Sequence, residues 1–349
     1  MNEAAGLDRR RFLKGVAAGG AASVAFSGRA QGAGMASKSN PVSVEVPHRP
    51  LGTTGLQVSA LGVGGFHLGS AKDQNEANEI VALAIDAGVN FFDNAWDYHE
   101  GLSEERLGTA LQGKRNKAVL MTKVCTHGRD KKVAMRMLEE SLRRLRTDHL
   151  DIWQIHEVIY ENDPDLIFAP DGAAEALAEA KKQGKVRFIG FTGHKDPSIH
   201  LRMLSHGFPF DTVQMPLNCF DATFRSFEQR VLPEARKRGV AVLGMKSLGG
   251  SGELVKYGGV TPAEGLRYAM SLPVATTISG MESVEVLKQN LEVARGFEPY
   301  SADQMQALRS RCQTLAGDGH FELYKTTKFY DGEEGRQQHH FPPASELPY

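Results

Sequence analysis

Hydrophobic and polar positions follow two alternating patterns along the chain from residue 48 onward. Short apolar runs, typical of buried strands, alternate with segments whose apolar residues recur about every three or four positions, typical of amphipathic helices. A hairpin with a glycine turn is predicted first, at 48–59. The strands predicted after it are 59–65, 90–95, 118–124, 150–156, 186–193, 212–218, 240–248 and 275–281. The helices predicted between and after them are 75–88, 103–111, 131–146, 172–184, 197–207, 225–239, 261–272 and 283–296.

This series of strand–helix pairs determines the expected fold class. Parallel strands joined by crossover helices, repeated about eight times over roughly 250 residues, are typical of an α/β protein with a closed (β/α)8 TIM barrel. An open, doubly wound sheet is the structural alternative at this point. In a barrel, catalytic residues come from the carboxyl ends of the strands and from the loops that follow them.

The N-terminus has the pattern of an export signal. Arg9 and Arg10 precede a weakly hydrophobic stretch of alanine and glycine at 15–26. This pattern resembles a twin-arginine signal peptide, expected at 1–30 and followed by a flexible linker at 31–47. The apolar stretch is too short and too rich in glycine for a stable membrane span. We therefore expect the twin-arginine export machinery to move the folded protein into the periplasm or another extracytoplasmic space.

The barrel is expected to span 48–316 and to be followed by an irregular C-terminal tail at 317–349. The tail is rich in glycine, proline, histidine and aromatic residues. Because aromatic side chains gain much free energy on burial, the tail is expected to pack on the barrel. Ordinary packing alone would explain its aromatic content, and closure of a pocket at the barrel mouth is the further role that we predict for it. The aromatic residues of the tail include Phe321, Tyr324, Phe329, Tyr330 and Phe341.

The overall composition narrows the choice of partners. The chain has 41 basic and 42 acidic residues and a formal net charge of -1, so neither nucleic acid nor an anionic membrane surface is expected as its main partner. Cys125, Cys219 and Cys312 lie far apart and form no CxxC motif, which argues against a disulfide scaffold or a zinc site. No metal site is expected, because the strand ends carry neither an HxH motif nor clustered carboxylates.

Four residues at predicted strand ends, or in the loop just after one, carry the candidate chemistry: Asp93, Tyr98, Lys123 and His156. A tyrosine is a poor acid near neutrality because its free pKa is about 10. A nearby ammonium stabilises the phenolate and is expected to lower that pKa. A carboxylate can hold the ammonium, and a histidine can orient a carbonyl oxygen. Such a group is suited to reducing a carbonyl by hydride transfer with coupled protonation.

The sequence around these residues resembles the aldo-keto reductase family. The stretch GVNFFDNAWDYHEGLSEERLGTAL at 88–111 resembles its main signature, and MTKV and WQIH resemble two further ones. The resemblance implies a nicotinamide dinucleotide, NAD(H) or NADP(H), lying across the barrel mouth. It implies that Tyr98 is the general acid or base, that Lys123 lowers its pKa, that Asp93 pairs with Lys123 and that His156 orients the substrate oxygen.

The resemblance also implies which residues contact the cofactor. His194 stands where the family often has an asparagine, and Met245 stands where it often has an aromatic residue that stacks on nicotinamide. Glu282 stands in a loop where a 2′-phosphate would favour a cation, which favours NAD(H) over NADP(H). The residues implied in cofactor contacts are Gly65, Phe66, Thr192, His194, Gln214, Met245, Lys246, Ser279, Gly280, Glu282 and Asn290.

Two functions from different classes are compatible with these patterns. The first is an exported oxidoreductase that interconverts a carbonyl and an alcohol, with a sugar or cyclic polyol as a suitable substrate and with a tightly held cofactor. The alternative is a non-catalytic, cofactor-binding regulatory or partner subunit. The intact set of four residues favours the enzyme.

Overall fold

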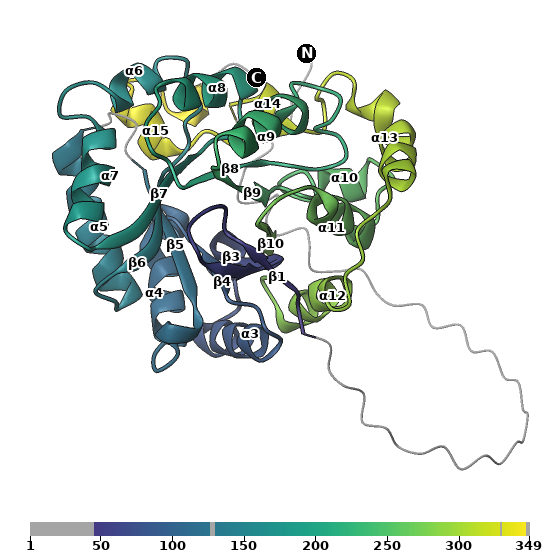
Figure 1. Cartoon of the computed structure of the whole chain (residues 1–349), viewed down its shortest axis with the longest axis horizontal. Helices are drawn as coiled ribbons and strands as arrows, with labels where there is room; N and C mark the ends of the chain where they lie inside the picture. The colour runs from purple at the N-terminus through teal and green to yellow at the C-terminus, as the bar shows by residue number, and fades with distance from the viewer. Residues whose placement is uncertain (1–44, 126–129, 329, 347–349) are drawn as a thin grey trace, which may run out of the picture. The chain divides into compact units, whose positions relative to one another are not determined.

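The structure is a computed structural model, and it describes residues 45–125, 130–328 and 330–346 (Figure 1). The predicted signal peptide and most of the predicted linker lie outside the described residues. Packed structure begins at Val46, which is buried and whose amide donates a hydrogen bond to the carbonyl of Ala87. In the part of the chain that is described, no helix combines the length and the hydrophobicity that a membrane crossing requires.

Eight parallel strands close into a barrel, in the order β10-β3-β4-β5-β6-β7-β8-β9. The closure is made by β10 and β3, where Ile278 pairs with Gly62, so the TIM barrel is confirmed and the open sheet is excluded. The barrel strands are β3 (Leu61–Gly64), β4 (Phe91–Asp93), β5 (Val119–Val124), β6 (Leu150–Ile155), β7 (Val186–Thr192), β8 (Thr212–Pro216), β9 (Ala241–Met245) and β10 (Thr276–Gly280).

The predicted hairpin precedes the barrel. Strands β1 (His48–Pro50) and β2 (Gln57–Ser59) pair antiparallel around a turn that contains Gly55 at φ 82°. Leu51 and Val58 of this hairpin are fully buried in one cluster with residues at the amino ends of barrel strands. The hairpin therefore closes the amino end of the barrel and leaves the carboxyl end for chemistry.

Helices surround the barrel because their apolar stripes pack on the outer faces of the strands (Figure 1). Side-chain caps at Asp73, Asp130, Ser226 and Thr261 fix several of their starts. The helices are α2 (Gly65–Leu68), α3 (Gln74–Asp86), α4 (Leu102–Ala110), α5 (Lys131–Leu145), α6 (Asp163–Ile167), α7 (Ala173–Lys182), α8 (Pro197–Ser205), α9 (Phe227–Lys237), α10 (Glu253–Lys256), α11 (Pro262–Ser271), α12 (Val284–Ala294), α13 (Ala302–Ala316), α14 (Leu323–Thr326) and α15 (Glu333–Gln338), with 3-10 turns at η1 (Tyr98–Gly101), η2 (Arg115–Lys117) and η3 (Ala344–Glu346).

Strand β9 ends three residues earlier than its sequence pattern predicts. The apolar run at 240–248 predicts a strand over its whole length, whereas β9 ends at Met245. Lys246 adopts a left-handed backbone conformation with φ 54°, which a strand cannot continue. The strand therefore stops at Met245, and the amide of Gly249 donates a hydrogen bond to the carbonyl of Lys246 in the turn that follows.

The described residues of the tail after α13 include the short helices α14 and α15, which lie on the same side of the barrel as α6 and α8 (Figure 1). Lys325 anchors it: its ammonium lies 2.6 Å from a carboxylate oxygen of Asp221 and 2.9 Å from one of Glu322. All three side chains are fully buried. Tyr324 adds a hydrogen bond of 2.8 Å with the side-chain amide of Asn218.

Candidate active site

Three adjacent strands bring the four candidate residues together. Asp93 is the last residue of β4, Lys123 lies near the end of β5, and His156 directly follows β6. These strands are neighbours in the closed barrel. Tyr98 begins the turn η1 after β4, and the positive φ of His99 at 53° turns the chain sharply behind it. The strand ends therefore place all four side chains at the carboxyl end of the barrel.

The ammonium of Lys123 connects the group. Its Nζ donates to Oδ1 of Asp93 at 2.5 Å, to the backbone carbonyl of Asn94 at 2.7 Å and to the Tyr98 hydroxyl at 3.3 Å. Lys123 and Asp93 are both buried. An ammonium has three N–H donors, so these contacts use its whole donor capacity and aim one donor at the Tyr98 oxygen.

The pKa of Tyr98 is raised well above its ordinary value, which is opposite to the direction expected from the sequence. Burial of the phenol is the main cause, and the negative charges of Asp93, Asp97 and Glu157 add to it. The charge of Lys123 is largely matched by its ion pair with Asp93. The phenol therefore keeps its proton in this structure and is available as a proton donor.

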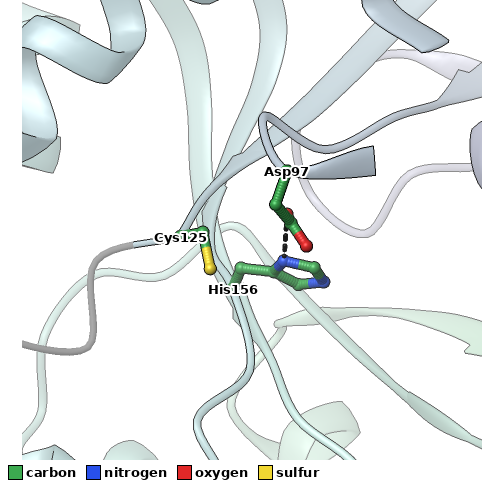
Figure 2. Close-up of side chains that lie close together, drawn as sticks. All are labelled: Asp97, Cys125 and His156. Atoms are coloured by element: carbon green, nitrogen blue, oxygen red, sulfur yellow. Dashed lines mark hydrogen bonds and ion pairs between the residues drawn. The ribbon is translucent and has the colours of Figure 1, made fainter. Parts of the chain in front are cut away.

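A carboxylate that was not identified from the sequence orients His156. Its ring Nδ1 lies 2.9 Å from Oδ1 of Asp97, and Figure 2 shows the two side chains pointing toward each other. The imidazole is edge-on to the Tyr98 ring, with centroids 5.6 Å apart. An Nδ1–H donated to a carboxylate fixes the plane of the ring and turns Nε2 away from Asp97. The available sequence signal was the position of Asp97 directly before Tyr98.

Cys125 lies beside this pair. One ligand atom each from Asp97, Cys125 and His156 lies within 4.8 Å of the others, so within the described ranges this group has the atoms to hold a metal ion (Figure 2). The hydrogen bond between Asp97 and His156 accounts for the closeness of two of these atoms. The absence of a metal site therefore stays a prediction, and the hydrogen bond shows directly that Asp97 orients His156.

The residues implied in cofactor binding come from the other five strands of the barrel. Gly65 and Phe66 follow β3, Thr192 ends β7 with His194 just beyond it, and Gln214 lies in β8. Met245 ends β9, Lys246 follows it, Ser279 and Gly280 end β10, Glu282 follows, and Asn290 lies on α12. One arc of the mouth thus carries the catalytic candidates, and the remaining arc carries the cofactor candidates.

The side chain of Gln214 tests whether a nicotinamide fits this arc. It is buried, and its Oε1 has no hydrogen-bond partner among the described residues. A buried acceptor without a donor is costly, and the carboxamide N–H₂ of nicotinamide would satisfy it. On the same arc the Asn290 amide donates to Ser279 at 3.2 Å and to the Gly280 carbonyl at 3.1 Å, which ties α12 to the end of β10.

Two further basic side chains, Lys246 and His194, lie at the carboxyl end of the barrel. The ammonium of Lys246 lies 4.8 Å from the ring centre of Tyr330 and 5.6 Å from that of Tyr324. Burial, aided by the positive charge of Lys123, lowers the pKa of Lys246 to about 8. Burial likewise lowers the pKa of His194, whose Nδ1 lies 3.1 Å from the Tyr324 carbonyl oxygen.

The tail contributes directly to the mouth. The amide of Gly332 donates to Glu157 at 3.1 Å, and the Gln338 side chain donates to the Cys125 carbonyl at 3.0 Å. The Lys195 ammonium donates to Asp331 at 2.5 Å. By contrast, a cavity of about 300 Å³ is lined by Arg115, Asp151 and other residues at the amino ends of the strands, away from the catalytic group. The tail therefore packs over the end of the barrel that carries the four candidate residues.

Comparison with known proteins agrees with this geometry. Residues 60–258, more than half of the chain, match the aldo/keto reductase family. The chain is 30% identical over 205 residues to the aldo-keto reductase YhdN of Bacillus subtilis, covering 54% of this chain and 58% of YhdN. It is 33% identical over 214 residues to L-galactose dehydrogenase of Arabidopsis thaliana, covering 57% and 65%. The matched regions thus span less than two thirds of either relative.

A solved structure is similar over a longer range. The holo form of aldo-keto reductase AKR11C1 from Bacillus halodurans has a TM-score of 0.64 and 25% identity, and the match covers 77% of this chain and 97% of that one. The family match and the barrel with its shared topology lead to one conclusion. The chain belongs to the aldo/keto reductase family of NAD(P)-dependent oxidoreductases.

Proposed function

We propose that this protein interconverts a carbonyl and an alcohol, with Tyr98 as the general acid in reduction and the general base in oxidation. The observation that carries the proposal is the Lys123 ammonium, which contacts Asp93 at 2.5 Å and the Tyr98 hydroxyl at 3.3 Å. As a proton leaves the phenol, the growing negative charge on its oxygen is stabilised by the adjacent ammonium. Asp93 keeps that ammonium in position.

The other residues of the mouth orient the reactants. His156 would position the substrate oxygen, a role supported by its contact with Asp97 and by its packing against Tyr98. The nicotinamide, when bound, supplies or accepts the hydride. Gln214 is suited to hold its carboxamide, and Lys246 is suited to contact its phosphates. The tail, through Tyr324 and Tyr330, would close the site and exclude water.

We favour NAD(H) over NADP(H) as the cofactor. Glu282 follows β10 and is exposed, and a carboxylate there repels a 2′-phosphate. Lys288 on α12 is also exposed, and either it or a cation from elsewhere in the chain could compensate. Calorimetric titration should give NADH a dissociation constant equal to or below that of NADPH. A much tighter complex with NADPH would reject this assignment.

We also propose that the protein is exported and keeps its cofactor. The N-terminal pattern with Arg9 and Arg10 supports export, and an exported enzyme has no obvious external pool of nicotinamide cofactor. A tightly held cofactor could serve a redox-neutral cycle on a sugar or cyclic polyol, and the similarity to a sugar dehydrogenase supports that substrate class. Mass analysis of the mature protein should find bound cofactor, and recovery of empty protein that needs a large excess of added NADH would contradict retention.

Turnover with a panel of aldehydes, ketones and sugars tests the proposed reaction. We expect the protein to oxidise NADH or NADPH with at least one carbonyl, and Lys123→Met to lower kcat/KM by at least ~100-fold. Lys328→Met, at an exposed position of the tail, is the control and should leave turnover intact. Equal turnover by the folded Lys123→Met variant would remove Lys123 from the mechanism. The non-catalytic alternative has no support from the comparisons.

A further inference from the structure

Two of the three cysteines lie in direct contact, although 93 residues separate them in the sequence. Cys219 lies in the loop after β8, and Cys312 lies on α13. Their sulfur atoms are 3.8 Å apart, and both residues are fully buried. The spacing of the cysteines in the sequence contains no sign of this pair, because only the packing of α13 on the barrel brings them together.

The pair lies where the tail is fastened to the barrel. Asn218, the residue before Cys219, holds the Tyr324 hydroxyl, and Asp221, two residues after Cys219, holds the ammonium of Lys325. Helix α13 ends at Ala316 and leads directly into the tail. A covalent bond between the two sulfurs would therefore join α13 to the same loop that anchors α14.

We propose that Cys219 and Cys312 form a redox modification site, at which an intramolecular disulfide forms under oxidising conditions. Two S–H bonds break and one S–S bond forms, and two electrons and two protons pass to a small-molecule or protein disulfide, which is reduced to two thiols. A disulfide bond is about 2.05 Å long, so the sulfurs must approach each other by roughly 1.8 Å. One thiol is on a helix and the other is in a loop, so no barrel strand has to move.

The burial of both sulfurs sets the kinetics of this step. An external oxidant reaches a fully buried thiol only when α13 separates from the loop, or before the packing is complete. Oxidation of the folded protein is therefore expected to be slow and to be accelerated by mild denaturant. Cys125 is equally buried, but its thiol lies beside Asp97 and His156, so it provides an internal reference.

Intact mass spectrometry of the full chain tests the proposal. Protein is incubated with oxidised glutathione in mild denaturant, returned to native buffer, denatured and alkylated with iodoacetamide. Reduced protein should carry three alkyl groups, and oxidised protein should carry one, on Cys125. The thermal unfolding midpoint of the oxidised form should be higher by about 5 °C, and a dithiol reductant should reverse the change, since the cross-link closes a loop of 93 residues.

Matched variants separate the pair from general oxidation. The Cys125→Ala variant should still form the disulfide bond. The Cys219→Ala and Cys312→Ala variants should not form it, and their thermal unfolding midpoints should not rise on oxidation. Three alkylated thiols after oxidation, or glutathione adducts on Cys219 or Cys312 in place of the internal bond, would overturn the proposal. If an alanine variant fails to fold, peptide mapping of the oxidised wild-type protein still decides. None of these readouts requires turnover, so they are independent of the proposed function.

Discussion

At the scale of single residues, the site is organised around the ammonium of Lys123, whose three N–H donors all have an acceptor. Lys123 has three donors and three acceptors within reach, namely Asp93, the carbonyl of Asn94 and Tyr98. The positive charge of Lys123 is largely neutralised by the negative charge of Asp93. Burial of the phenol therefore has a larger effect on the pKa of Tyr98 than Lys123 has. A raised pKa makes the phenol a weaker acid, so the proposed proton donation depends on the adjacent ammonium to stabilise the phenolate oxygen as the proton leaves.

Asp97 is expected to act through His156. Replacing it by asparagine, as Asp97→Asn, removes the carboxylate that holds Nδ1 at 2.9 Å. We expect kcat/KM for carbonyl reduction to fall about 10-fold, in line with the loss of an interaction with a charged group, while the cofactor dissociation constant stays unchanged. Glu100→Gln makes the same change of charge at an exposed position of the same turn. A variant pair with identical kinetics would show that Asp97 does not position the imidazole.

Lys246 gives cofactor binding a predicted dependence on pH. Its pKa of about 8 means that the ammonium is charged at pH 7 and mostly neutral at pH 9. If it contacts the cofactor phosphates, affinity falls as the pH rises through 8, by ~5-fold or about 1 kcal/mol. Fluorescence titration of NADH should show this loss in the wild-type protein and a flat profile in Lys246→Met. The same slope in both proteins would place Lys246 away from the phosphates.

At the scale of secondary structure elements, the barrel could be predicted because each of its strands and helices has a recognisable pattern of apolar residues within its own short segment. Each strand is a short apolar run and each helix repeats its own stripe, so the alternation can be read without knowing any contact. The four catalytic candidates could be found because Asp93, Lys123 and His156 lie at or next to the ends of three consecutive strands and Tyr98 lies in the turn after the first of them. The conformation of Lys246 and the contact of Asp97 with His156 could not be found, since both depend on how loops turn after the strands.

The contacts of the tail could not be predicted from the sequence either. Its aromatic content predicts packing, but the anchor is an ion pair between Lys325 and Asp221, which are 104 residues apart. No local pattern connects two charges at that separation. Their burial has a cost that is offset only when each charge has its partner.

This anchor predicts a large loss of stability on removal of its cation. Lys325→Met would leave Asp221 and Glu322 buried without an ammonium, so we expect the free energy of unfolding to fall by about 3–5 kcal/mol. Lys328→Met removes an exposed charge from the same segment and should change stability by less than about 0.5 kcal/mol. Denaturant unfolding monitored by circular dichroism measures both. Equal midpoints for the two variants would mean that the buried triad does not hold the tail.

At the scale of the whole molecule, the two ends of the closed barrel differ in what they carry. The hairpin β1–β2 closes the amino end, and the carboxyl end carries both arcs of functional residues. Strands β4, β5 and β6 carry the residues of the proposed proton-transfer group, while the remaining strands carry those of the proposed cofactor contacts. The tail crosses this end and contacts both arcs through Glu157, Cys125 and His194. The proposed proton donor, the proposed cofactor contacts and the tail therefore lie at the same end of the barrel.

The most direct test of this account is a single-turnover experiment with Tyr98→Phe. Protein saturated with NADH or NADPH is mixed with an accepted carbonyl, and loss of the reduced nicotinamide absorbance is followed. We predict that the rate falls by roughly 10²–10⁴-fold while cofactor affinity is unchanged, and that Tyr257→Phe, at an exposed tyrosine, reacts like the wild-type protein. A Tyr98→Phe protein that reduces the carbonyl at near the wild-type rate would contradict the central claim that Tyr98 supplies the proton.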